Sequence, residues 1–164
     1  MGCTAMRKAL HIVFALGAAL AAADVHAYCV RNALTERVHA SVVASRMPVP
    51  LPAKMFSETV AAGKEFCCNP KTAECNPDRA NDQSTLMFEA RVEVAPTPVK
   101  CGAPDPKAQG RVVAVAPVRG FLRFEANAGF DKSKPPAGNN PPFLLKALTA
   151  DNKVVTTYTC PPRG

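Results

Sequence analysis

Short runs in which apolar and polar residues alternate recur along the whole chain. The longest covers residues 86–94, where every second residue is apolar and most of the residues between are charged. Strict alternation over this length predicts a half-buried antiparallel strand, with one face in the core and the other in water. Residues 111–116 and 121–126 predict two further strands, and residues 117–120 predict the turn between them.

Three pairs of such runs are close enough together to predict hairpins. They cover residues 28–45, 53–69 and 143–158, and each has polar or small residues at its centre. In the second pair the turn contains Gly63, a residue that readily adopts the positive φ that a tight turn needs. We therefore expect the two runs of each of these pairs to lie side by side in one sheet.

Long proline-rich or polar segments separate these runs. Residues 72–83, 96–109 and 127–142 predict loops, and the alternate prolines of residues 47–52 predict an extended connector at a sheet edge. The chain has sixteen prolines and no sustained helical period. The pattern predicts an all-β fold in one domain, residues 28–164: an antiparallel sandwich or a partly closed barrel of about eight or nine short strands.

The first 27 residues have the three parts of a secretory signal peptide. Arg7 and Lys8 precede the apolar segment 9–23, and small residues at Val25 and Ala27 predict cleavage before Tyr28. The apolar segment is shorter than the roughly 20 residues of a membrane span. An uncleaved anchor is the alternative. We expect bacterial-type export to the periplasm or the medium, with no membrane span left after cleavage.

Six of the seven cysteines lie after the predicted signal. An even number of cysteines in an exported chain predicts a disulfide framework, here three bridges. Binding of a soft metal by thiolates and a redox-active pair are the alternatives for the group at residues 67–75. The predicted bridging residues are Cys29, Cys67, Cys68, Cys75, Cys101 and Cys160.

Strand alternation restricts how these cysteines can pair. Cys67 and Cys68 are adjacent, so their side chains point to opposite faces of a strand and need different partners. A short loop favours a bridge from one of them to the next cysteine. The predicted pairs are Cys67 or Cys68 with Cys75, the other of the two with Cys29, and Cys101 with Cys160.

The loop that follows the adjacent cysteines is the most polar segment of the chain. Its carboxylates and amides are oxygen donors, and calcium is the ion that such donors suit. However, the alternating aspartates and the glycine of a calcium loop are missing, and basic residues intervene, so we expect no cofactor and interpret the segment as a recognition loop. Its candidate residues are Glu74, Asn76, Asp78, Arg79 and Asp82.

The sequence offers little for catalysis. His39 is the only histidine after the predicted cleavage site, and neither a serine-hydrolase elbow nor a phosphate-binding loop is present. The remaining enzymatic interpretation is a small secreted hydrolase with a carboxylate pair between Glu58 and Asp82. We expect instead a non-enzymatic protein that binds a ligand through its long loops.

The charge of the chain limits the class of partner. Lysine and arginine outnumber aspartate and glutamate by 20 to 13, but the basic residues are scattered and tryptophan is absent. Proteins that bind nucleic acids concentrate basic and aromatic residues, so we expect no nucleic-acid partner. A diffuse positive charge favours an anionic envelope polymer or an acidic protein. The sequence does not indicate an oligomeric state.

Overall fold

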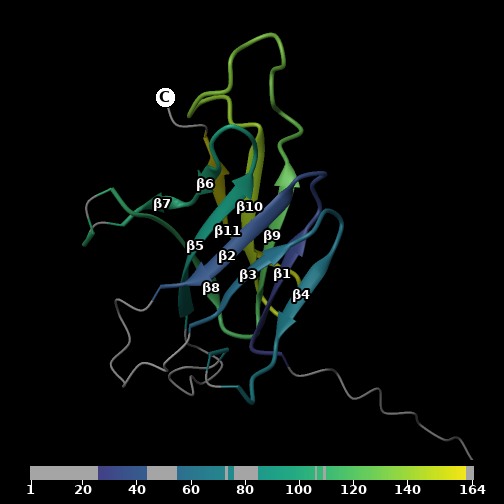
Figure 1. The fold of residues 1–164 in the computed structure, drawn as a ribbon, viewed down its shortest axis with the longest axis vertical. Helices are drawn as coiled ribbons and strands as arrows, with labels where there is room; N and C mark the ends of the chain where they lie inside the picture. Colours follow the sequence, from purple (N-terminus) through teal and green to yellow (C-terminus); the bar gives the residue numbers. More distant parts are fainter. Residues whose placement is uncertain are drawn as a thin grey trace, which may run out of the picture.

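A computed structural model describes residues 26–43, 55–72, 74–75, 85–105, 107–108 and 110–161, and these residues contain eleven strands (Figure 1). The segments predicted as a signal peptide (residues 1–25 of it) and as an extended connector (residues 47–52) lie outside the described residues. The strands are β1 (Tyr28–Asn32), β2 (Arg37–Val42), β3 (Ser57–Val60), β4 (Glu65–Cys68), β5 (Thr85–Glu93), β6 (Val99–Cys101), β7 (Ala103–Pro104), β8 (Val112–Pro117), β9 (Phe121–Ala126), β10 (Phe143–Leu148) and β11 (Val154–Cys160).

The strands form two sheets, which confirms the predicted all-β, sandwich-like fold. The five-stranded sheet has the order β11-β10-β9-β1-β4, and the six-stranded sheet has the order β3-β2-β5-β8-β7 with β6 beside β5. The sheets do not close into a barrel. Pairing is antiparallel except between β1 and β9, which run parallel. A parallel pair needs a long connection between its strands, and here most of the chain lies between the two.

Two of the three predicted hairpins are wrong. β1 and β2 lie in different sheets, and so do β3 and β4. Instead β1 pairs with β4, and β2 pairs with β3, so both connections cross from one sheet to the other. The third prediction is confirmed, because β10 and β11 form a hairpin. Gly63 has the expected positive φ of 66°, but it lies in a crossing turn.

Asn32 fastens the two crossing connections to each other. It is a polar side chain with only 3% exposure at the end of β1. Its amide nitrogen donates to the carbonyls of Glu36, Val60 and Ala61 at 2.8–3.0 Å, and its amide oxygen accepts from the Leu34 backbone N–H at 2.9 Å. One buried amide thereby satisfies backbone groups of both crossing connections, which could not otherwise be buried at low cost.

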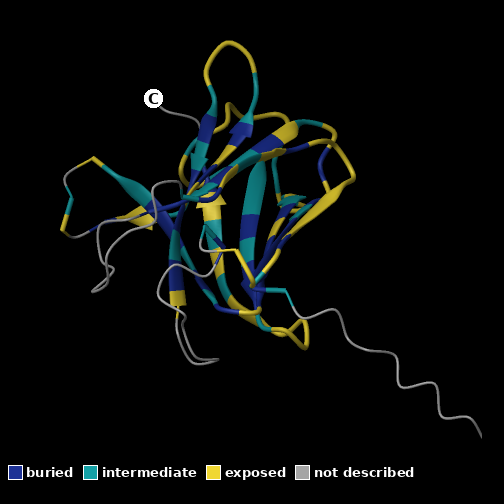
Figure 2. Cartoon of the chain, turned by 60° about the horizontal axis from the view of Figure 1, so that its bottom comes forward, coloured by how far each residue is buried: buried dark blue, intermediate teal, exposed yellow. Residues whose placement is uncertain are grey.

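The core lies between the sheets, and Figure 2 shows buried residues along the strands with exposed residues in the connections. β5 has the predicted alternation: Leu86, Phe88, Ala90 and Val92 are buried, and the residues between them are exposed or half-buried. Tyr28 fills the space between the sheets, and its ring centroid lies 5.0 Å from that of Phe88.

The prediction that residues 96–109 form a loop is also wrong in part, because the segment contains β6 and β7. Val99 and Cys101 are buried and pair with Val92 and Ala90 of β5. Four prolines in the segment indicate a loop, but the register leaves them outside the three residues of β6. A high proline content predicts a loop, and it gives no indication that three residues between the prolines form a strand with buried side chains.

All six predicted cysteines form disulfides, and the predicted pairing is confirmed. The bridges are Cys29–Cys67, Cys68–Cys75 and Cys101–Cys160. Cys67 is exposed and Cys68 is buried, as alternation along β4 requires. The first bridge joins β1 to β4 within one sheet, and the third joins β6 to β11 between the two sheets.

Candidate functional site: a hollow loop at one end of the sandwich

The connection 127–142 projects from one end of the sandwich and is the uppermost segment in Figure 1. Strand register fixes which end this is. β9 runs parallel to β1, and Phe124 lies beside Asn32. Tyr28, at the other end of β1, pairs with Cys68. The connection 127–142 and the described residues just after Cys68 (69–72) are therefore at opposite ends of the sandwich.

Residues of this connection line a hollow of about 400 Å³ that is open to solvent. Small-molecule sites in proteins have volumes of about 300–1,000 Å³, so the hollow could hold one unit of a larger ligand. Both charged and amide side chains reach it. The lining residues are Gly129, Asp131, Lys134, Pro135, Ala137, Asn139 and Asn140.

Asn140 keeps the hollow open from within. Its side-chain amide donates to the carbonyls of Asp131 at 3.0 Å, Pro135 at 3.3 Å and Lys134 at 3.4 Å, and its amide oxygen accepts from the Asp131 N–H at 2.9 Å. Its backbone also exchanges two hydrogen bonds with Ala137. In a segment with four prolines and no sheet ladder, this one side chain therefore supplies hydrogen-bond partners for the backbone. These bonds limit how far the loop can collapse.

The base of the loop is fixed by a second asparagine. Asn127 donates from its amide to the Pro141 carbonyl at 2.7 Å and accepts from the Gly129 N–H at 3.0 Å. Its own backbone N–H donates to the Pro142 carbonyl at 2.9 Å. These bonds close the loop where β9 ends and β10 begins, so the hollow is joined rigidly to the sheet.

Asp131 and Lys134 carry the charges at the rim. The Asp131 carboxylate accepts from the Ser133 hydroxyl at 2.6 Å and pairs with the Lys134 ammonium at 3.0 Å. These bonds to Ser133 and Lys134 lower the pKa of Asp131 below its ordinary value, so the carboxylate is ionised near neutral pH. The Lys134 side chain is 71% exposed, and a ligand can reach it.

The recognition residues predicted in the other polar loop are mostly untested. Asn76, Asp78, Arg79 and Asp82 lie outside the described residues. Glu74 is half-buried beside Tyr28, where burial, reinforced by the Glu74 charge, raises the pKa of the phenol. The structure therefore places Glu74 against the core.

Of the three described carboxylates of the hydrolase hypothesis, Glu74 lies in no strand and the other two lie on different sheets. Glu58 is in β3 of the six-stranded sheet, and Glu65 is in β4 of the five-stranded sheet, where Arg31 pairs with it. His39 has two hydroxyl neighbours that the sequence did not single out: Thr59 lies 3.1 Å from Nδ1 and Ser57 lies 3.4 Å from Nε2. All three lie on the outer face of the six-stranded sheet, where their neighbours along the strands alternate with buried residues.

Two sequence patterns in the 127–142 loop could have indicated the residues that hold it in shape. The loop itself was expected, but the asparagines that hold it were not distinguished from ordinary turn residues. The pattern Asp131-x-Ser133 predicts a local side-chain turn. An asparagine directly before two prolines, as at Asn140, marks a segment without ladder hydrogen bonds, whose carbonyls need side-chain donors.

No protein-family model, curated protein or solved structure matches this chain. Within the part of the chain that the structure describes, no apolar helix reaches the length of a membrane span.

Proposed function

We propose that this protein is an exported, non-enzymatic binding protein that takes one unit of an anionic envelope polymer into the hollow of the 127–142 loop. The observation that carries the proposal is the hollow itself, held open by the hydrogen bonds of Asn140 and fixed to the sheet by those of Asn127. A preorganised loop loses little conformational entropy when it binds, and this favours recognition.

The charges of the loop and the chain support an anionic ligand. Lys132 is exposed and Lys134 is exposed at the rim, while Asp131 neutralises part of the second charge. The excess of basic residues over the whole chain adds a weak long-range attraction that salt would screen. The amide of Asn139, at the lining of the hollow, provides a neutral group that can bond to a hydroxyl of a saccharide unit.

The test measures binding to immobilised anionic envelope polysaccharides and to an uncharged polysaccharide of similar length. We expect binding to the anionic polymers that weakens as salt rises, and a loss of at least about tenfold in affinity for the loop variant Lys134→Glu. Lys153→Glu is the matched control, because Lys153 also pairs with a nearby aspartate, at 2.6 Å, in the β10–β11 turn at the opposite end of the domain.

Several results would contradict the proposal. Equal losses for the loop variant and the Lys153 variant would show that only net charge matters. Binding to an acidic protein but to none of the polymers would reject the polymer as the ligand and favour an acidic protein, the other predicted partner. Shortening of the polymer during incubation would favour the hydrolase alternative, and the same samples can be analysed for chain length.

A further inference from the structure

The hollow of the 127–142 loop has a charge pattern that restricts which anion it can take. Asp131 and Lys134 are the only charged side chains among the described residues that line it, and they pair at 3.0 Å between Oδ2 and Nζ. The two charges cancel each other, so the lining itself has no excess positive charge. A ligand unit with one negative charge therefore fits better than a unit with several, because like charges side by side are costly.

Both charged groups keep bonding capacity that a ligand can use. An ammonium group has three protons, and Lys134 directs one of them to Asp131, which leaves two for a ligand. The Oδ1 atom of Asp131 already accepts from the backbone N–H and the hydroxyl of Ser133, at 3.0 and 2.6 Å. Its Oδ2 atom bonds to Lys134 alone in the described part of the chain, so it can accept one further proton. The pair thus offers a donor for an anionic group and, next to it, an acceptor for a hydroxyl.

Asn139 adds a neutral group whose hydrogen bonds are not used within the described residues. It lies in the tight turn between Ala137 and Asn140, whose backbones exchange two hydrogen bonds at 3.0 and 3.2 Å. Its side chain is exposed, whereas the amide of Asn140 is occupied by three backbone carbonyls. An amide both donates and accepts, so Asn139 suits a hydroxyl of the ligand.

The rest of the lining is small and apolar. Gly129, Pro135 and Ala137 contribute no charge and no polar side-chain atom. Apolar linings of this kind bind ligands through contact with their carbon skeleton, while a few polar groups fix the orientation. A rigid ring gains from this contact, whereas a flexible polyol chain loses conformational freedom when it is ordered. The lining therefore favours a ring with one acidic group and several hydroxyls.

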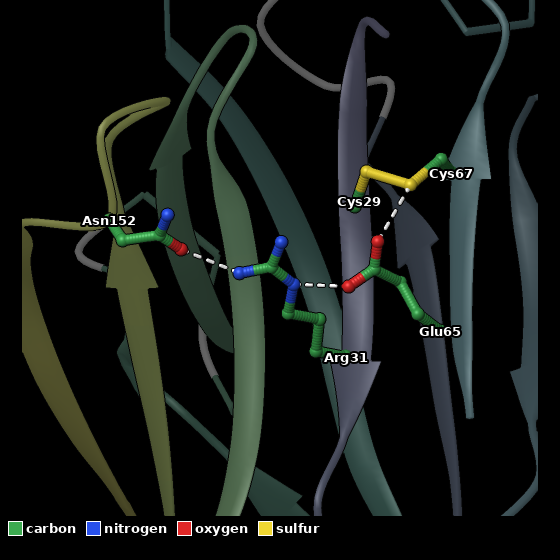
Figure 3. Close-up of a disulfide and its surroundings, with 5 residues drawn as sticks. All are labelled: Cys29, Arg31, Glu65, Cys67 and Asn152. Carbon is green, nitrogen blue, oxygen red and sulfur yellow. Dashed lines mark hydrogen bonds and ion pairs between the residues drawn. A yellow bond between two sulfur atoms is a disulfide. The ribbon is translucent and has the colours of Figure 1, made fainter. Parts of the chain in front are cut away.

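Arg31 provides a contrast, because the bonds of this cation are already used (Figure 3). It lies beside the disulfide that joins β1 to β4, binds the Glu65 carboxylate and donates to the Asn152 side chain at 2.6 Å. Its guanidinium also lies 3.6 Å from the centroid of the Phe121 ring. The Arg31 side chain is 32% exposed against 71% for Lys134, so the lysine of the loop is the more accessible of the two cations.

We propose that the hollow is specific for a sugar-acid unit, a saccharide ring that carries one carboxylate and free hydroxyls, as in polymers of uronic acids. Lys134 binds the carboxylate, Asp131 accepts from a neighbouring hydroxyl, Asn139 bonds to a second hydroxyl, and the apolar lining packs against the ring. This inference rests on the proposed function, and it selects one class among the anionic polymers.

Asp131 is the residue that makes the selection. Its lowered pKa keeps the carboxylate ionised near neutral pH, so it repels any further negative charge on the same unit. A multiply sulfated ring should therefore bind less tightly than a ring with one carboxylate, despite its greater total charge. A general attraction between the basic chain and an anion predicts the opposite order. The order of affinities thus separates a specific site from diffuse charge.

Isothermal titration calorimetry of the oxidised protein with oligomers of matched length measures this order. The four probes are a polyuronate oligomer, its methyl ester, a multiply sulfated oligosaccharide and a glycerol-phosphodiester oligomer. The ester keeps the ring without the charge, and the phosphodiester keeps one charge per unit without the ring. We expect the polyuronate to bind most tightly, and each of the other three to bind at least about tenfold more weakly, because each leaves part of the lining without a matching group.

Asp131→Asn is the variant that tests the selection, since it removes the charge and keeps the size of the side chain. We expect the preference for the uronate over the sulfated oligomer, as the ratio of their dissociation constants, to fall at least about tenfold. Asp151→Asn is the matched control, because Asp151 also pairs with a lysine, Lys153, and accepts from a hydroxyl, that of Thr149. It should leave the ratio unchanged. Circular dichroism and melting curves of each variant separate misfolding from a change in specificity.

The results that would overturn the inference differ from those that would overturn the proposed function. Equal or tighter binding of the sulfated or the phosphodiester oligomer, or an unchanged ratio in Asp131→Asn, would refute the sugar-acid specificity. The proposed function would then still stand, provided that Lys134→Glu weakens the binding of the anionic polymer. Binding of the methyl ester as tight as that of the uronate, or no binding of any anionic oligomer or polymer, would refute both.

Discussion

Replacing Asn32 with alanine tests how strongly one buried amide holds the two crossing connections. The substitution removes four hydrogen bonds to the backbone, two of them fully buried, those to Val60 and Leu34. The other two, to Glu36 and Ala61, are partly buried. The backbone groups cannot turn to water without opening the crossing turns, so the substitution leaves buried polar groups without partners.

The expected loss in the free energy of unfolding can be summed from these four hydrogen bonds. A buried group that loses its partner costs about 1–3 kcal/mol, and a partly buried hydrogen bond contributes about 0.5–1 kcal/mol net. Two bonds of each kind sum to about 3–8 kcal/mol, but three carbonyls share the two hydrogens of one amide NH2 group, so we expect a loss in the lower part of this range, about 4 kcal/mol in the free energy of unfolding. This is a large share of the roughly 5–15 kcal/mol of a typical domain, and lowers the midpoint of thermal unfolding by about 8–16 °C.

Urea unfolding of the oxidised protein, followed by circular dichroism, measures the loss. Asn127→Ala is the matched control, because Asn127 makes a similar pair of backbone hydrogen bonds in a more exposed loop and should cost about 1–2 kcal/mol. Asn32→Asp should be at least as harmful as Asn32→Ala, since a carboxylate would face three carbonyl oxygens. If Asn32→Ala costs no more than Asn127→Ala, the crossing turns do not depend on the amide and the reasoning is refuted.

Three further predictions concern stability. Gly120→Ala should destabilise by more than about 3 kcal/mol in urea unfolding, because its Cβ would lie 2.2 Å from the Leu148 carbonyl oxygen, whereas Gly138→Ala, with open space around it, should stay within about 0.5 kcal/mol. Tyr158→Phe should cost about 1–2 kcal/mol, since its hydroxyl bonds to backbone groups of β8 in the opposite sheet; an unchanged midpoint would contradict this. Burial and a neighbouring arginine lower the pKa of His39, so stability should fall as the pH drops below about 6.5 towards the folded-state pKa. Melting curves between pH 7.5 and 5 should show this slope in the parent and lose it in His39→Gln.

The alternation along β5 and the disulfide pairing could be predicted because both follow from local geometry. Whether a residue faces the core depends on a period of two, which is visible in residues 86–94. The separation of Cys67 from Cys68 follows from the same period, and the short segment to Cys75 then selects the partner. For β5 and for Cys68–Cys75 the sequence contains the physical constraint within a few residues, whereas Cys101 and Cys160, 59 residues apart, are simply the pair that remains.

The pairing of the strands could not be predicted in the same way. A connection that turns back within one sheet and one that crosses to the other have the same alternation and turn residues, as residues 61–64 show. The crossing is stabilised by Asn32, a residue far away in the sequence, and a lone asparagine is an ordinary turn residue by its type. The hollow of the 127–142 loop also depends on bonds that only the folded chain brings together.

The place of β1 in its sheet has a consequence for the order in which the fold can be completed. β1 lies between β4 and β9, so one of its edges stays open until residues 121–126 have been synthesised. Cys101 likewise has to wait for its partner, which comes 59 residues later. Contacts this distant in sequence form slowly. The N-terminal part of a growing chain therefore cannot complete either the five-stranded sheet or its disulfide set, and the domain stays open until its last strand arrives.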